Sequence, residues 1–305
     1  MTRTRQQLRV AAGALTVVVL ALTGCTAGSV DGDGGDVTDA RTPSDGPVTV
    51  TPREGTCHHT DELVADAAAY QPVDCDRPHL TETVHVGVFT GEHAAHPTVP
   101  STGSTGRGAA RAECDQRAAE FLGDVWQAGR LSLRVVVPSQ AAWNGGDRWF
   151  RCDLGEVGLD DGELAARSGS LAGTLSGEAP LRLGCFAPEF TDDGSLDALP
   201  PTSCDEPHSS EFVGTYVEDG QLTLDEAFSR SDAVNDRCLG VVAAYANVPA
   251  DADLQYRVGS FYVLPYENEW DEGDRRIRCF AWQSDPPLTR SVRGGGTPAL
   301  PIRYG

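Results

Sequence analysis

Two short motifs carry side chains that could bind a metal, transfer a proton or hold a ligand, and each motif occurs twice. The first, C-D-x-P-H-x2-E, spans residues 75–82 and 204–211. The second, P-x4-W-x2-G-D-R-x2-R-C, spans residues 138–152 and 265–279 without a gap. Agreement at so many fixed positions indicates an internal duplication, so the chemistry of each motif has to be judged together with its copy.

The first motif offers a histidine and a glutamate, His79 with Glu82 and His208 with Glu211, as metal ligands or as an acid–base pair. Residues three apart on a strand point to opposite faces, and the residues after Glu82 have the composition of a strand. We therefore favour a structural role in which each histidine bonds a neighbouring group in a turn. The alternative is a wall-acting or metal-dependent enzyme that uses His79, Glu82, Asp147 or their counterparts.

The second motif supplies an aromatic ring, a carboxylate and a guanidinium in each copy: Trp143, Asp147 and Arg148, then Trp270, Asp274 and Arg275. We expect each tryptophan to cap the core beside a hairpin, which in the first copy turns at Asn144-Gly145, and each Asp–Arg pair to form a cross-strand salt bridge. A ligand site is the alternative, because tryptophan and arginine are enriched at binding surfaces. These six residues, with His79 and His208, are the candidate binding residues.

Composition excludes several function classes. The chain has 24 basic and 45 acidic residues, its formal net charge is −21, and every basic residue is arginine. Walker loops and Ser-x2-Lys hydrolases need a lysine, which this chain lacks. Binding to nucleic acid needs clustered cations, so we expect no nucleic-acid partner. The sequence also indicates no cofactor, and a non-catalytic role is the favoured interpretation.

The N-terminus has the features of an export signal. Arg3, Arg5 and Arg9 precede an apolar stretch, residues 10–22, that is too short for the roughly 20 residues of a membrane-spanning helix. Leu22-Thr-Gly-Cys25 matches the bacterial lipoprotein signal box. We predict that residues 1–24 are removed and that Cys25 is acylated, which anchors the chain to the extracytoplasmic face of the membrane. An ordinary signal peptide with an accidental cysteine is the alternative.

The cysteines indicate an oxidising compartment. Of nine, Cys25 takes the lipid, which leaves eight, four in each copy. An even number of cysteines in an exported chain is typical of a disulfide framework. Zinc binding is disfavoured, because the chain has no Cys-x2-Cys pair. The expected bridges are Cys57–Cys75, Cys114–Cys152, Cys185–Cys204 and Cys238–Cys279. The alternative pairing within the first copy is Cys57–Cys152 with Cys75–Cys114.

Hydrophobic patterning predicts the elements around the motifs. Apolar residues alternate over residues 84–88, helical composition covers 109–124, and a β-branched run covers 131–137, while 91–108 has loop composition. We predict two homologous α+β domains, each a mostly antiparallel sheet with one packed helix, stapled by disulfides. The domains span 54–157 and 181–283; residues 25–53 form a flexible tether, 158–180 a linker, and 284–305 a disordered tail.

Taken together, the two motifs resemble the septum-formation domain family of actinobacterial envelope lipoproteins, here in two tandem copies. The resemblance covers both halves of the chain and implies an association with cell division or cell-wall assembly, without an established chemistry. It implies no catalytic residue. The expected function is therefore a binding or scaffold module, with the membrane as one partner through Cys25 and an envelope protein or glycan as the other.

Substituting Cys25→Ser tests the anchor. The variant should lose acyl labelling and normal lipoprotein processing, because serine offers no thiol for lipid attachment. Metabolic labelling with a fatty acid, followed by membrane fractionation, measures both effects, and Thr26→Ser is the control. A Cys25→Ser chain that still takes up label would contradict the lipoprotein prediction.

Overall fold

The two copies of the motifs lie in two sheets with the same strand order. This computed structural model describes residues 50–65, 70–158, 163–177, 179–192, 196–218 and 222–304. The predicted signal peptide 1–24, Cys25 and the predicted tether up to residue 49 lie outside the described residues. The end of the tether predicted over 25–53 is not a free coil, because Val50 is buried against Ala65, Val136 and Trp149. Among the helices that are described, none is long and apolar enough to span a bilayer. Residues 46–305 form one compact unit.

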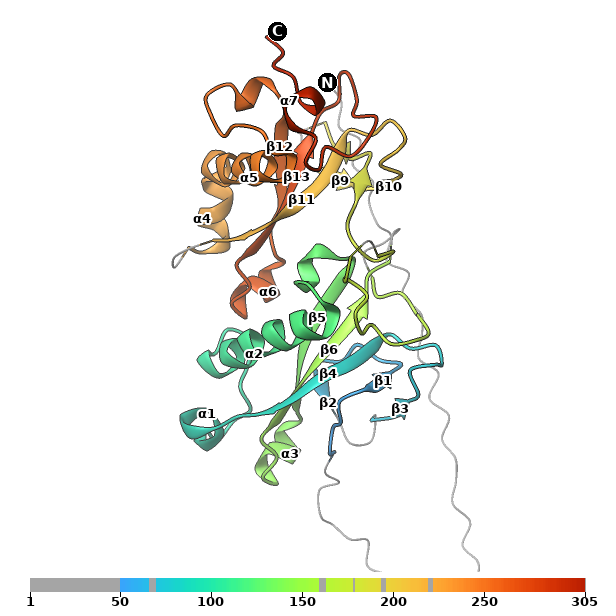
Figure 1. The fold of residues 1–305 in the computed structure, drawn as a ribbon. Coiled ribbons are helices and arrows are strands. Elements are labelled where there is room, and N and C mark those ends of the chain that lie inside the picture. The colour runs from blue at the N-terminus through green and yellow to red at the C-terminus, as the bar shows by residue number, and fades with distance from the viewer. Residues whose placement is uncertain are drawn as a thin grey trace, which may run out of the picture. The chain divides into compact units, whose positions relative to one another are not determined.

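The first copy builds a sheet of order β2-β5-β6-β4-β1-β3, with one long helix on one face (Figure 1). Its central strands β4, β6 and β5 are antiparallel, and only β2 runs parallel to its neighbour. In chain order the elements are β1 (Thr56–His58), β2 (Val64–Ala65), β3 (Pro72–Val73), β4 (Thr81–Val88), α1 (Gly91–Ala95), α2 (Thr105–Leu122), η1 (Trp126–Ala128), β5 (Leu131–Pro138), α3 (Gln140–Asn144) and β6 (Trp149–Glu156).

Counted from the opposite edge, the second copy repeats this order as β10-β7-β11-β13-β12. Its long helix is α5 (Figure 1). It has no counterpart of β2 among its described residues, and the short pair β8-β9 forms a separate sheet. Its elements are β7 (Cys185–Phe186), β8 (Glu189–Phe190), β9 (Leu196–Ala198), β10 (Pro201–Thr202), β11 (Ser210–Val217), α4 (Leu224–Ser229), α5 (Ser231–Ala246), η2 (Leu254–Tyr256), β12 (Gly259–Val263), α6 (Glu267–Asp271), β13 (Arg276–Trp282) and α7 (Gly296–Ala299).

Capping residues fix the ends of the long helices. The Ser104 side chain accepts a hydrogen bond from the Arg107 amide at the start of α2. At the other end Gly123 adopts φ 88°, a left-handed conformation that glycine takes without strain. Asn247 ends α5 at φ 57°. The helix predicted over 109–124 therefore begins four residues earlier, because Ser104 caps it.

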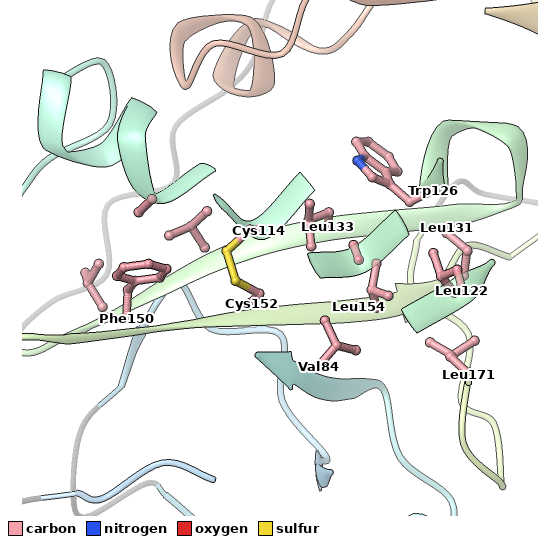
Figure 2. Close-up of a cluster of buried hydrophobic side chains, with 14 of the residues drawn as sticks. Val84, Cys114, Leu122, Trp126, Leu131, Leu133, Phe150, Cys152, Leu154 and Leu171 are labelled. Atoms are coloured by element: carbon pink, nitrogen blue, oxygen red, sulfur yellow. A yellow bond between two sulfur atoms is a disulfide. The ribbon is translucent and has the colours of Figure 1, made fainter. Parts of the chain in front are cut away.

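A disulfide joins each long helix to the central strand beneath it. Cys114 of α2 bonds Cys152 of β6 among buried apolar side chains that include Leu133 and Leu154 (Figure 2). Cys238 of α5 bonds Cys279 of β13 in the same way. The other two bridges are Cys57–Cys75 and Cys185–Cys204. All four predicted pairings are confirmed, as is the α+β class with mostly antiparallel sheets.

Three local predictions are wrong. Residues 140–144 form helix α3 instead of a two-residue turn, because Ser139 caps it by accepting a bond from the Ala142 amide. The predicted loop 91–108 contains α1 and the start of α2. The predicted linker 158–180 contributes Leu171 and Leu175 to the first core, where both are fully buried.

The predicted disordered tail is also wrong. Leu288, Val292 and Leu300 are buried and belong to the second core. The glycine and proline content of residues 284–305 favoured disorder, but three spaced apolar residues are enough to cover the end of a small core. The segment after the last motif cysteine is thus part of the fold in both copies.

The sheet faces that point away from the long helices differ in chemistry between the copies. In the first copy His58 Nε2 lies 2.9 Å from Thr83 Oγ1, which donates to Asp153 at 2.7 Å; Arg151 Nε also donates to Asp153, at 2.8 Å. In the second copy the positions of His58, Thr83 and Asp153 hold Phe186, Phe212 and Phe280, which pack together.

The registers show that these positions are equivalent. Thr83 lies opposite Asp153 as Phe212 lies opposite Phe280. His58 is only 2% exposed, because β1 directs it toward this buried face. Burial, together with the charge of Arg151, lowers the pKa of His58 to about 3.

A chain that ends at Pro287 should lose most of the stability of the second copy. It lacks Leu288, Val292 and Leu300, and removing even one buried leucine side chain costs about 2–5 kcal/mol. Denaturant unfolding and amide exchange in α5 measure the loss. A chain that ends at Arg303 is the control, because Tyr304 is 70% exposed. Equal stability of the two truncated chains would contradict the assignment of this segment to the core.

The depressed pKa of His58 predicts acid lability. Above pH 6.5 the imidazole is neutral in both states; as pH falls toward 3 the unfolded chain binds a proton that the folded chain does not, so stability is lost at up to about 1.4 kcal/mol per pH unit. His58→Phe, which copies Phe186, should reduce this slope, whereas His96→Phe at an exposed site should not. Urea unfolding at pH 7, 5 and 4 measures the difference. Asp153 is present in the parent and in both variants, so the comparison isolates the contribution of His58. The raised pKa of Asp153 makes the folded state more stable as the pH falls, which is the opposite of the effect of His58. An unchanged slope in His58→Phe would contradict the prediction.

Candidate functional site

The histidine and glutamate of the first motif fasten a later segment of their own copy. His79 exchanges two backbone hydrogen bonds of 2.9 Å with Arg167. Three residues further on, Ser170 Oγ and the Leu171 amide each donate to the Glu82 carboxylate at 2.7 Å. Glu82 is 2% exposed, and both of its oxygens accept bonds from residues of the predicted linker.

The second copy repeats this arrangement. His208 exchanges backbone hydrogen bonds of 2.9 Å with Leu288. Ser291 Oγ and the Val292 amide donate to the two oxygens of Glu211, and Tyr245 adds a third bond at 2.6 Å. The spacing of three residues between the paired backbone and the serine is the same in both copies. We call the segments 167–175 and 288–300 the closing segments.

The imidazoles of this motif also bond locally. His79 Nδ1 lies 2.8 Å from the Arg77 carbonyl oxygen, and His208 Nδ1 lies 2.7 Å from that of Glu206. A carbonyl oxygen only accepts, so Nδ1 carries the proton in both rings. This is the bond to a neighbouring group that the sequence predicts for these histidines.

Two groups of side chains have metal-like composition. Cys57, Cys75 and Glu82 approach within 4.8 Å, as do Cys185, His208 and Glu211. The expectation that His208 and Glu211 point to opposite faces is wrong, because His208 lies in the turn before β11 begins. The cysteines are nevertheless in disulfides, and a disulfide offers no thiolate ligand. Neither group has the donor set of a metal site.

The second motif builds a stacked Trp–Arg pair in each copy. The Arg148 guanidinium lies 4.0 Å from the centre of the Trp143 ring and donates to the Trp143 carbonyl oxygen at 2.7 Å. Arg275 lies 4.2 Å from the centre of the Trp270 ring and donates to its carbonyl oxygen. Both tryptophans are buried, so they support the turn through α3 or α6 and present no free ring to a ligand.

The expected Asp–Arg salt bridges do not form. In the described part of the chain Arg148 and Arg275 donate to the backbone oxygens of Asp147 and Asp274, not to their carboxylates. Neighbouring residues cannot face each other across a strand pair, and the guanidinium is already aligned with the tryptophan ring. The Asp274 carboxylate instead accepts a bond of 2.9 Å from the Arg276 amide.

Within the first copy, the two motifs lie at opposite ends of the sheet. The residues after His79 begin β4, where Thr81 pairs with Gly155. Asp147 precedes the other end of the same pair, where Val88 lies opposite Trp149. Seven strand steps separate these ends, roughly 20 Å. His79, Glu82 and Asp147 therefore do not meet in a single site.

Asp274, one of the candidate binding residues, and three charged residues that the motifs did not indicate connect the two copies. Arg107 and Arg111 of α2 bond the two oxygens of Glu272 at 2.8 and 3.3 Å. Asp274 lies 3.5 Å from Arg111 and accepts a bond of 3.1 Å from Gln127. These carboxylates and guanidiniums are almost fully buried, so each depends on its partner for the hydration it has lost.

A cavity of about 510 Å³ lies beside these ion pairs and is lined by both copies. Leu131 and Leu133 of β5 line it together with Val263 and Phe280 of the second sheet. The volume is in the range of ligand-binding cavities, which are mostly apolar with a few fixed polar groups.

Beside Glu272, two further charged groups of the second copy line this cavity, Glu269 and Arg278. Burial raises the pKa of Glu269, whose carboxylate also accepts a bond of 3.1 Å from the Tyr266 amide. The Arg278 guanidinium donates to the Gln127 carbonyl oxygen at 2.9 Å and lies 5.3 Å from the centre of the Trp126 ring. An acid, a cation and apolar walls can together bind an amphipathic ligand.

Apart from Asp274, which the second motif indicates, sequence reasoning missed this site because its residues differ between the copies. Arg107 and Arg111 correspond to Ser231 and Asn235, and Glu272 corresponds to Gly145. A search for shared residues discards such positions. The signal that could have found them is the opposite one: positions where a charge in one copy replaces a small or neutral residue in the other.

Comparison with known proteins gives a family match over most of the described chain. No curated protein and no solved structure shows significant similarity to the chain. The model of the septum-formation family matches residues 54–285, a span that includes both sheets and both copies of each motif. The chain therefore belongs to the septum-formation family.

Proposed function

We propose that this chain is a lipid-anchored, extracytoplasmic envelope protein that acts in septum formation as a non-catalytic binding or scaffold module. Its partner is an envelope protein or glycan, and its origin is an actinobacterial envelope. The cavity between the two copies is the proposed binding site. Family membership supports a role in division or in the envelope; the anchoring, the binding role and the origin are part of the proposal.

The cavity is the observation that carries the proposal. It is built from side chains of both copies, and the buried pairs of Arg107 and Arg111 with Glu272 fix its border. The residues that an enzyme would have used have other roles in the described structure: Glu82 and Glu211 fasten closing segments, and the Trp–Arg pairs support turns. Binding in the cavity needs no further chemistry from them.

Anchoring through Cys25 suits this role. A chain attached by its N-terminus, with residues 26–49 as a tether, can reach partners near the membrane without electrostatic docking to anionic lipid, which a net charge of −21 disfavours. The eight cysteines of the two copies favour the same side of the membrane.

Filling the cavity tests the proposal. Ser132 lines the cavity and is partly buried, so Ser132→Trp should occupy the space while the cores stay intact. In a strain that lacks the chain, the parent gene should restore septum frequency and Ser132→Trp should fail to do so. Thr289→Trp, at an exposed residue outside the lining, is the control.

Folding has to be checked first, by comparing the unfolding temperatures of the three purified proteins. Full rescue by a folded Ser132→Trp chain would exclude the cavity as the binding site. A deletion strain with normal septa would contradict the role in septum formation.

A further inference from the structure

Strand β12 has an unpaired edge at the place where its counterpart in the first copy has a partner. In the first sheet β2 lies parallel to β5, with Val64 opposite Val137, and the Val137 amide donates to the Leu63 oxygen at 3.1 Å. In the second sheet β12 is the last strand, and across the described ranges no strand lies on its outer side. Such an edge offers its N–H and C=O groups to another chain.

The two edges are equivalent in register. Arg134 of β5 lies opposite Asp153, and Phe261 of β12 lies opposite Phe280, at matching positions after the motif cysteines. Counting along the strand, Leu264 corresponds to Val137. Backbone groups of alternate residues point to the same side of a strand, so the amides of Tyr262 and Leu264 face the open edge.

The edge is accessible and carries a surplus of negative charge. Residues 259–263 are all only partly buried, and Tyr266, just beyond them, is 72% exposed. Helix α6 follows with the exposed carboxylates of Glu267 and Asp271, where the first copy has Gln140 and Asn144. The second copy has thus replaced two neutral residues by acids beside its open edge.

Nearby cations do not cancel this charge. Arg130 pairs with Glu156 at 3.3 Å and Arg134 with Asp61 at 3.4 Å, so both are neutralised within the first copy. Arg278, opposite Val263 on the inner side of β12, donates to the Gln127 carbonyl oxygen and lies over the Trp126 ring. A cationic segment would therefore be attracted to the edge. The tether, which is rich in aspartate, and a second copy of this acidic chain carry the wrong charge.

We propose that β12 accepts an extended, cationic segment of a partner protein as an added parallel strand, in the way that β5 accepts β2. Backbone hydrogen bonds would supply affinity, and the acids of α6 would select positive charge. This inference rests on the proposed binding function and names the chemistry of its partner.

A peptide based on β2 provides the probe. It keeps the Leu-Val-Ala of residues 63–65 and has arginine at the two preceding positions and the one that follows. Mixed with the full mature chain, it should slow hydrogen exchange of the Tyr262 and Leu264 amides at least tenfold. A peptide with glutamate in place of arginine should not, and neither should one with proline in place of its leucine and alanine, because proline cannot complete the ladder.

Charge reversal on the protein tests the selection. The double variant Glu267→Arg/Asp271→Arg should weaken peptide binding about threefold to tenfold, since each exposed charge contributes modestly. Gln140→Arg/Asn144→Arg, the same change in the first copy, is the matched control and should leave binding unchanged. Both pairs of sites are exposed, and the unfolding temperature of each variant confirms its fold.

Three results would overturn the proposal: no protection of β12 by the arginine peptide, equal protection by the glutamate peptide, or protection without peptide that rises with protein concentration. The last would show that a second copy occupies the edge. None of them would affect the proposed binding function, which the Ser132→Trp experiment tests separately.

Discussion

Removing a carboxylate from water costs several kcal/mol unless donors replace the lost hydration, and Glu82 and Glu211 meet this condition in the same way. Each carboxylate accepts hydrogen bonds from a serine hydroxyl and from a backbone amide of a closing segment, which follows the last motif cysteine. A buried acid thus requires its segment to be in place, and the segment brings Leu171 or Val292 into the core. The sheet, the helix and the closing segment of each copy therefore depend on one another.

This constraint explains which residues the copies share. A buried side chain that makes the same hydrogen bond or ring contact in both copies tolerates little change, because replacing it leaves its buried partner without a bond. The histidine and glutamate of the first motif and the Trp–Arg pair of the second make such contacts. Several residues that differ lie on the opposite sheet face or where the copies meet, as with Asp153 and Phe280 or Gly145 and Glu272. Duplication preserved the bonds within a copy and left the surfaces between copies free to diverge.

Much of the fold could be predicted from the sequence, but the candidate site could not. The repeated cysteines gave the disulfides, since identical order in both halves limits the pairings, and alternation located the main strands. The closing segments escaped prediction because only a serine and a few spaced apolar residues recur in them. The partners of Glu272 are more than 160 positions away and have no repeated counterpart, so no local pattern indicates them.

Under the proposed function, the pair of copies is the unit that binds. Each copy has its own core and its own disulfides, but the cavity described above takes its walls from both. Its walls are β5 of the first copy and the sheet face around Phe280 of the second copy. A single family match across residues 54–285 agrees with this, because it includes both contributors. The asymmetry at the interface, with arginines on one side and acids on the other, is what a duplicated fold requires if two similar surfaces are to fit together without repelling each other.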